Sequence, residues 1–138
     1  MGRYLAIDHG SKRIGLALSD PMKIIAKPYK TITYKSLDTF FALLIDIIEE
    51  KLVECIVLGY PLGMKGQETL QTKQVLEFQK QLKPKIKIPI LLQDERLSSL
   101  SAEKALILQK VKTGHNKGHI DKTAAAIFLQ QFLDTNSL

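Results

Sequence analysis

Three acidic residues sit at positions where a fold could gather them into one metal site. They are Asp8 at the end of an apolar run, Glu95 in the charged triplet 94–96, and Asp121 at the start of a helix-like stretch. Carboxylate oxygens are the ligands that Mg²⁺ and Mn²⁺ prefer in proteins. The chemistry therefore depends on whether the surrounding elements bring these three side chains together.

The hydrophobic pattern of the first two thirds predicts an α/β fold. Segments 3–8, 14–20 and 24–33 read as strands, and the short connections between them predict antiparallel neighbours. Apolar residues at helical spacing then predict a helix over 37–48 with Ser36 as its N-cap. Further strands are expected at 53–58 and 88–93, with a helix at 68–82 between them. Because the segment 53–58 is apolar almost without interruption, we expect a parallel strand that is covered on both faces.

The last third is expected to be helical. A helix that begins near 98–101 and runs to about Lys110 should be followed by a polar loop over 112–118 and a last helix over 119–133. In that last helix Asp121 shares a stripe with Ala125 and Phe128, so it should face the protein. The prediction is one domain spanning 1–138, with three antiparallel strands, then two parallel strands, flanked by helices.

The composition of the chain indicates what kind of partner it binds and in which compartment it works. The chain has 138 residues, of which 45% are apolar, and carries 20 Lys and Arg against 14 Asp and Glu, a net charge of +6. That size suits one core, and that charge favours a polyanion such as nucleic acid. The single cysteine, Cys55, excludes an intramolecular disulfide and should be buried, which suits a reducing cytoplasm. The first residues run straight into a predicted strand, and Asp46 interrupts the most apolar stretch, so we expect no leader and no membrane span.

Two basic, glycine-containing segments lie next to the acids in the sequence. Asp8 is followed by a turn with a glycine, a serine, Lys12 and Arg13, whose amides and cations could hold an anion. An ordinary hairpin with a solvated basic tip is the alternative. Lys117 belongs to the polar segment 112–119, which is either a phosphate-contacting loop or a solvated one.

Two more segments leave alternatives open. Strand alternation allows only one of Asp94 and Glu95 to face the site, and Arg96 could pair with either. The glycine-rich connection 59–68 follows a predicted strand and could bind a phosphate at the next helix, or serve only as a loop. Asp121 could equally be an acid that complements the dipole at a helix N-terminus.

Taken together, four blocks of the sequence resemble the signature segments of the YqgF/RuvX family. The blocks are AIDHGSKRIGLA at 6–17, GYPL at 59–62, DERLSS at 94–99 and IDKTAAA at 120–126. Family members are RNase H-like proteins described as Holliday junction resolvases or as nucleases that mature the 5′ end of pre-16S ribosomal RNA. The blocks occur in the family's order and at similar spacing over nearly the whole chain.

The resemblance implies a role for each candidate residue. Asp8, Glu95 and Asp121 would be the catalytic, metal-binding carboxylates, holding Mg²⁺ or Mn²⁺ for two-metal-ion hydrolysis of a phosphodiester. Lys12 and Arg13 would contact nucleic acid. Arg96 and Lys117 are further candidates for that contact.

Three functions remain open from the sequence. The first is a ribonuclease of ribosomal RNA maturation, which would act on structured RNA in ribosomal precursor particles. The second is a Holliday junction resolvase acting on branched DNA, which needs two active sites and hence a homodimer rather than a monomer. The third is a non-catalytic module that binds RNA or ribosomes and keeps the fold.

Overall fold

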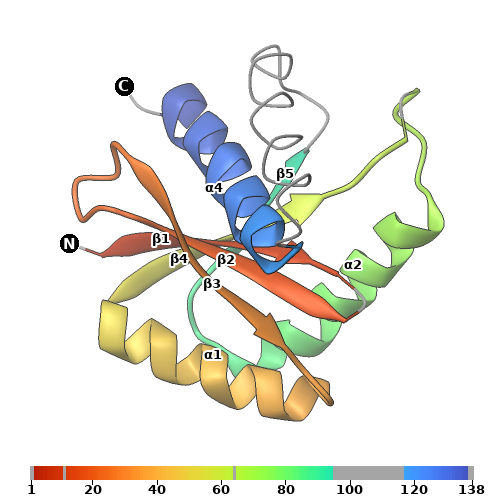
Figure 1. Cartoon of the computed structure of the whole chain (residues 1–138), viewed down its shortest axis with the longest axis horizontal. Coiled ribbons are helices and arrows are strands. Elements are labelled where there is room, and N and C mark those ends of the chain that lie inside the picture. Colours follow the sequence, from red (N-terminus) through yellow and green to blue (C-terminus); the bar gives the residue numbers. More distant parts are fainter. Residues whose placement is uncertain (1, 11, 64, 95–116, 137–138) are drawn as a thin grey trace.

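A five-stranded sheet with β1 at its centre organises the chain (Figure 1). The computed structural model describes residues 2–10, 12–63, 65–94 and 117–136, the last range by its backbone alone at 117–121 and at 136. The strands are β1 (Arg3–His9), β2 (Arg13–Ser19), β3 (Ala26–Thr33), β4 (Val53–Tyr60) and β5 (Ile90–Asp94). The helices are α1 (Leu37–Lys51), α2 (Leu70–Leu82), the 3₁₀ turn η1 (Lys83–Lys85) and α4 (Lys117–Asn136).

The strand pairing confirms the predicted mixed sheet. The order is β3-β2-β1-β4-β5, with β1–β2 and β2–β3 antiparallel and β1–β4 and β4–β5 parallel. Short turns connect the antiparallel strands, whereas helices connect the parallel ones, because a parallel partner can be reached only by a crossover. The central strand is thus held by an antiparallel neighbour on one side and a parallel neighbour on the other.

Helices cover both faces of the sheet, α1 and α2 on one and α4 on the other (Figure 1). Alternation along β1 assigns its side chains, since Leu5 and Ile7 pack with α1 and α2, while Ala6 packs under α4. The α4 side of the sheet is built from small residues, including Ala6 and Ala17, so this helix can approach the strands closely. Its own buried stripe includes Ala125, Phe128, Leu129 and Phe132.

The buried strand β4 confirms the prediction for Cys55. The thiol is buried in the sheet, and burial is the main cause that raises its pKa to about 11, with the Glu54 carboxylate adding to the shift. A thiol with that pKa is inert at neutral pH, so Cys55 serves packing. None of the described helices is long and apolar enough to cross a membrane.

The start of β3 differs from the prediction by two residues. Residues 20–25 form a loop, which the Asp20 carboxylate closes by accepting hydrogen bonds from the backbone N–H groups of Met22, Ile24 and Ile25 at 3.2, 2.7 and 2.8 Å. Because these amides bond to a side chain, they do not join the sheet ladder, and the strand begins at Ala26.

Element boundaries near the helices also shift. Helix α2 begins at Leu70 rather than at 68, because Thr69 forms a capping box with Thr72. Pro84 ends the α-helix as expected, but one 3₁₀ turn follows it, which proline tolerates at its start. Helix α4 begins at Lys117, so this residue is helical and not part of a loop. The helix expected between 98 and 110 lies outside the described residues.

Leu52 ends α1 in a left-handed backbone conformation, with φ 55° and ψ 52°. A residue with a Cβ atom in that region destabilises the fold by about 1–2 kcal/mol. Glycine removes this strain, but it makes the unfolded chain more flexible and so costs about 0.5–1 kcal/mol of stability. The side chain is 69% exposed, so little packing is lost on removing it. We expect Leu52→Gly to raise the free energy of unfolding in urea by about 0.5–1 kcal/mol. Leu52→Ala, which keeps the strain, is the control, and an equal gain there would contradict the explanation.

Candidate active site at the carboxyl end of the central strand

Asp8 lies near the carboxyl end of β1, the central strand. It shares a strand face with Tyr4 and Ala6, the face that packs under α4. The side chain is half-buried. A carboxylate at this depth requires polar partners or a cation, because burial without them is costly.

The nearest positions on both strands beside Asp8 are glycines. Gly15 of β2 is its paired residue, and Gly59 of β4 follows Leu58, the partner of Ile7. Neither glycine places a side chain next to the carboxylate. Groups that reach the carboxylate must therefore come from farther along these strands, from α4 or from a ligand.

The turn between β1 and β2 holds the basic residues close to this end of the sheet. A Cβ atom at Gly10 would lie 2.5 Å from the Arg13 carbonyl oxygen, so the turn closes only with glycine there. The Tyr34 hydroxyl donates a hydrogen bond to the Gly10 carbonyl at 3.0 Å, and burial raises the pKa of this phenol. Lys12 is exposed, and Arg13 lies on the face of Gly15 and Asp8 by alternation. Both predicted cations thus lie at the end of the sheet where Asp8 is.

His9 points to the opposite face and is not part of the carboxylate site. Its ring lies 4.7 Å from that of Phe78, centroid to centroid, and burial lowers its pKa, which keeps the imidazole neutral at pH 7. His9 and Gly10 line a cavity with three residues of α2: Leu70, Gln71 and Gln74. No sequence pattern singles out these two glutamines, because exposed polar residues are ordinary on a helix surface.

The end of β5 distinguishes Asp94 from its neighbour. Asp94 pairs with Tyr60 and shares a strand face with Ile90, which packs against the α1 and α2 core. Asp94 therefore points away from the face of Asp8. Burial is the largest cause that raises the pKa of Tyr60, followed by its hydrogen bond to Glu68 at 3.2 Å, with the Asp94 charge contributing least.

The connection from β4 to α2 is a closed loop held by its own backbone. The Gly63 N–H donates to the Gln67 carbonyl at 2.8 Å, and the Gly66 N–H donates to the Gly63 carbonyl at 2.9 Å. Gly66 has φ 84°, a left-handed value that favours glycine. The glycines thus fold this loop back on itself at the carboxyl end of the sheet.

The direction of α4 places its first turns over the Asp8 end of β1. Near the helix C-terminus the Phe132 ring lies 5.7 Å from that of Tyr4, and Gln130 bonds to Ile24 and Ala26 at the far end of the sheet. The backbone of Asp121 is 11 residues before Phe132, or about 17 Å along a helix. Asp8 is four residues beyond Tyr4, or about 13 Å along a strand. The backbones of the two residues therefore approach the same end.

Of the three predicted carboxylates, Asp8 is the one whose side chain is described. Glu95 and Arg96 lie outside the described residues, and of Asp121 and Lys117 only the backbone is described. Within the described part of the chain, no three Asp, Glu, His or Cys side chains come together as metal ligands. The structure thus brings Asp8, Lys12 and Arg13 to one end of the sheet and orients α4 toward it.

Two solved structures of the RNase H-like fold share this architecture. A Thermus thermophilus RuvC in complex with a Holliday junction substrate superposes with a TM-score of 0.58 and 12% identity, covering 98% of this chain and 95% of that one. A fowlpox virus resolvase, solved with Holliday junction DNA, gives a TM-score of 0.58 at 10% identity, with 99% of each chain covered. At these identities the likeness shows the fold, which is the one that the sequence blocks implied.

The sequence comparison identifies the family. The model of the RuvX family, described as Holliday junction resolvase, matches residues 2–135, and the chain belongs to that family. A relative from Maridesulfovibrio salexigens named "Putative pre-16S rRNA nuclease" is 43% identical over 131 residues, covering 95% of this chain and 97% of the relative. A Roseiflexus protein of the same name is 40% identical over 134 residues, covering 97% and 95%.

The turn beside Asp8 offers a test of how closely the site is built. Gly10→Ala puts a methyl group against the Arg13 carbonyl, so the backbone must shift. We expect a loss of about 1–3 kcal/mol in the free energy of unfolding in urea. Lys12→Ala, at an exposed position of the same turn, should stay within about 0.5 kcal/mol of the parent protein. Equal free energies of unfolding for the two variants would show that the turn can accommodate a methyl group at Gly10, which would contradict this explanation.

Proposed function

We propose that the protein is a metal-dependent nuclease that hydrolyses phosphodiester bonds, acting in the 5′-end processing of pre-16S ribosomal RNA in the cytoplasm. The observation that carries this proposal is the position of Asp8, half-buried between two glycines at the end of the central strand and facing α4. The names of the relatives support the ribosomal RNA substrate. The net charge of +6 suits a polyanionic partner, including RNA within ribosomal precursor particles.

The proposed ligand set is Asp8, Glu95 and Asp121. Asp94 faces the other side of the sheet from Asp8, which supports Glu95 as the ligand of the two acids. Asp121 belongs to the first turns of α4, which run toward the same end. Three carboxylates offer the hard oxygen donors that suit Mg²⁺ or Mn²⁺, and the glycines beside Asp8 leave space for such an ion.

The chain's own residues would position the substrate for hydrolysis. Lys12 and Arg13 would bind phosphates next to the scissile bond. Arg96 would add a cation from the segment that follows β5, and Lys117 would add one from the start of α4. When bound, Mg²⁺ or Mn²⁺ would supply an activated water and charge stabilisation for an in-line displacement, in the two-metal-ion manner. No side-chain nucleophile is then required. The turn closed at Gly10 fixes where the two cations stand relative to Asp8.

A second candidate function is resolution of Holliday junctions. The description of the family model favours it, since that model is named for this activity. A resolvase must cut two strands, so it would work as a homodimer with two copies of the site. A comparison of structured RNA with four-way DNA junctions as substrates separates the two candidates.

A cleavage assay tests the proposal directly. With Mg²⁺ or Mn²⁺, we expect the protein to cut a pre-16S RNA fragment, and Asp8→Asn and Glu95→Gln each to reduce the rate on the order of 100-fold or more. Asp94→Asn is the matched control, because this carboxylate faces the other side of the sheet, and it should retain most of the activity. Cleavage that survives Asp8→Asn would refute the site. RNA binding without any cleavage would instead support the non-catalytic module.

Thermal stability tests whether Asp8, Glu95 and Asp121 lie close together, and this test does not depend on enzymatic activity. In EDTA, neighbouring carboxylates repel one another, so Asp8→Asn should melt at a higher temperature than the parent protein. Mg²⁺ at ten times its Kd should stabilise the parent by about 1.4 kcal/mol, a rise in Tm of about 3–6 °C, and the variant by less. Scanning calorimetry with and without Mg²⁺ measures both. Equal responses of the two proteins would count against a shared site.

A further inference from the structure

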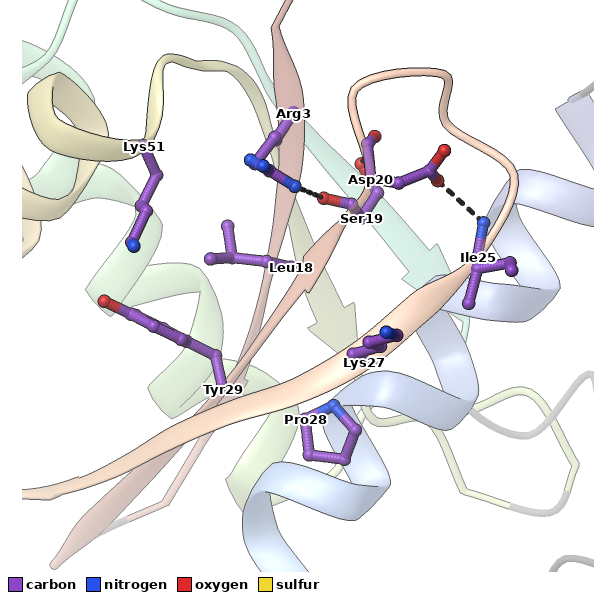
Figure 2. A pocket seen from close by; sticks show the side chains of 9 residues that line it. All are labelled: Arg3, Leu18, Ser19, Asp20, Ile25, Lys27, Pro28, Tyr29 and Lys51. Carbon is purple, nitrogen blue, oxygen red and sulfur yellow. Dashed lines mark hydrogen bonds between the residues drawn. The ribbon is translucent and has the colours of Figure 1, made fainter.

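A cation-lined cavity lies at the other end of the sheet from Asp8 and on the other face. It has a volume of about 310 Å³, and its lining includes Arg3, Lys27, Lys51, Tyr29 and Leu18 (Figure 2). Arg3 begins β1, five residues before Asp8, so the two are about 17 Å apart along the strand. The proposed catalytic carboxylates therefore cannot account for these cations.

Three structural elements contribute one cation each to this cavity. Arg3 comes from β1, Lys27 from the edge strand β3, and Lys51 from the last turn of α1. Figure 2 shows the Arg3 side chain and Leu18 between Lys51 and Tyr29 on one side and the Asp20 loop on the other. Arg3 donates a hydrogen bond to the Ser19 carbonyl at 3.0 Å, which holds the guanidinium at the cavity wall. Strands and a helix thus form most of the cavity, and Asp20 and Ile25 of the loop 20–25 complete it.

A bulge in β3 adds a fourth cation beside the cavity. Lys30 pairs with Leu16 while Pro28 pairs with Ala17, so Tyr29 is the extra residue. The bulge lets Tyr29 and Lys30 both lie on the α1 face, where strict alternation would place only one of them. The Lys30 and Lys51 ammonium groups lie 5.1 and 5.7 Å from the centre of the Tyr29 ring. Tyr29 thus brings two cations to one aromatic surface.

The one carboxylate in the lining does not neutralise these cations. Asp20 is bonded to backbone N–H groups of its own loop, those of Ile25 and Ile24 foremost, and these bonds lower its pKa so that it stays ionised. In Figure 2 its carboxylate is directed to Ile25 and away from Arg3. Glu54, which is not part of the lining, forms an ion pair with Lys23. Three lining cations against one lining carboxylate leave an excess of positive charge.

We propose that this cavity is a second nucleic-acid site, which binds backbone phosphates of a strand with Lys27, Lys51 and Arg3, and packs a base or ribose on Tyr29. Cations beside a partly exposed aromatic side chain are a common means of holding a single strand without reading its sequence, and Tyr29 is half-buried. The site extends the proposed function, because a large RNA that wraps the β3 edge could contact both ends of the sheet. It would fix the substrate at a distance from the bond that is cut.

A purely protective role for the edge strand is the competing explanation. Lysine and proline on an edge strand prevent pairing with other chains, and β3 carries Lys27, Pro28 and Lys30. That role does not explain Arg3 and Lys51, which lie on other elements and line the same cavity. The experiment must therefore separate the cavity from positive charge in general.

Fluorescence anisotropy with a labelled 12-nucleotide single-stranded RNA, in EDTA, tests the site. The pair Lys27→Ala and Lys51→Ala removes two phosphate contacts and keeps Arg3, whose hydrogen bond is structural. We expect affinity to fall on the order of ten-fold, and the slope of log K against log salt to decrease by about 1.4. The matched pair Lys80→Ala and Lys87→Ala removes the same charge from exposed positions outside the lining, and affinity should fall less than about two-fold. Equal losses in the two pairs, or no loss in either, would overturn the proposal.

Nuclear magnetic resonance locates the contact on the folded protein. Adding the same RNA should shift the backbone amide signals of Leu18, Lys27 and Tyr29, and the double variant should lose these shifts while its other signals stay in place. Shifts confined to residues around Asp8 would exclude the second site. If inorganic phosphate binds these amides as tightly as RNA does, the cavity is a small-anion site and the nucleic-acid proposal is wrong. Neither measurement involves cleavage. The second site can therefore be tested even if the protein has no nuclease activity.

Discussion

The structure depends on the dual pairing of β1, which is antiparallel to β2 and parallel to β4. A strand in that position is covered on both faces along its middle, where Leu5, Ala6 and Ile7 are apolar and fully buried. Asp8 is admitted because it comes one residue before the strand ends, where the sheet opens to solvent. The same pairing brings the carboxyl ends of β1, β4 and β5 to one edge, and open α/β sheets bind ligands at such an edge.

The sequence was sufficient to predict most of the fold because its periodicities are strong. The run Val53–Leu58 marks a strand buried on both faces, and the apolar spacing from Leu37 marks a helix with one buried side. The failures are at boundaries, and two of them have a local cause in side-chain bonding. The hydrogen bonds of the Asp20 carboxylate move the start of β3 to Ala26, and the cap at Thr69 determines where α2 begins. Such bonds depend on geometry that hydrophobic patterns do not encode.

The candidate site was predictable in its residue types but not in its directions. Alternation alone left Asp94 and Glu95 equivalent, and it was the pairing of Asp94 with Tyr60 and the packing of Ile90 that assigned Asp94 to the far face. The cavity around Tyr29 had no signal in the sequence at all. Its cations are far apart in the chain, and the bulge that gathers two of them is a property of strand register.

The bulge at Tyr29 also determines which genetic changes this strand can accept. Point substitutions on β3 alter one side chain and leave its neighbours facing as before. Deletion of Tyr29 would restore strict alternation and leave the other pairs of β3 with β2 in place, so Ile32 would stay opposite Ile14 in the core while the cavity would lose its aromatic ring. Among descendants of this chain, the sheet should therefore accept a β3 that is shorter by this one residue wherever the cavity has no use.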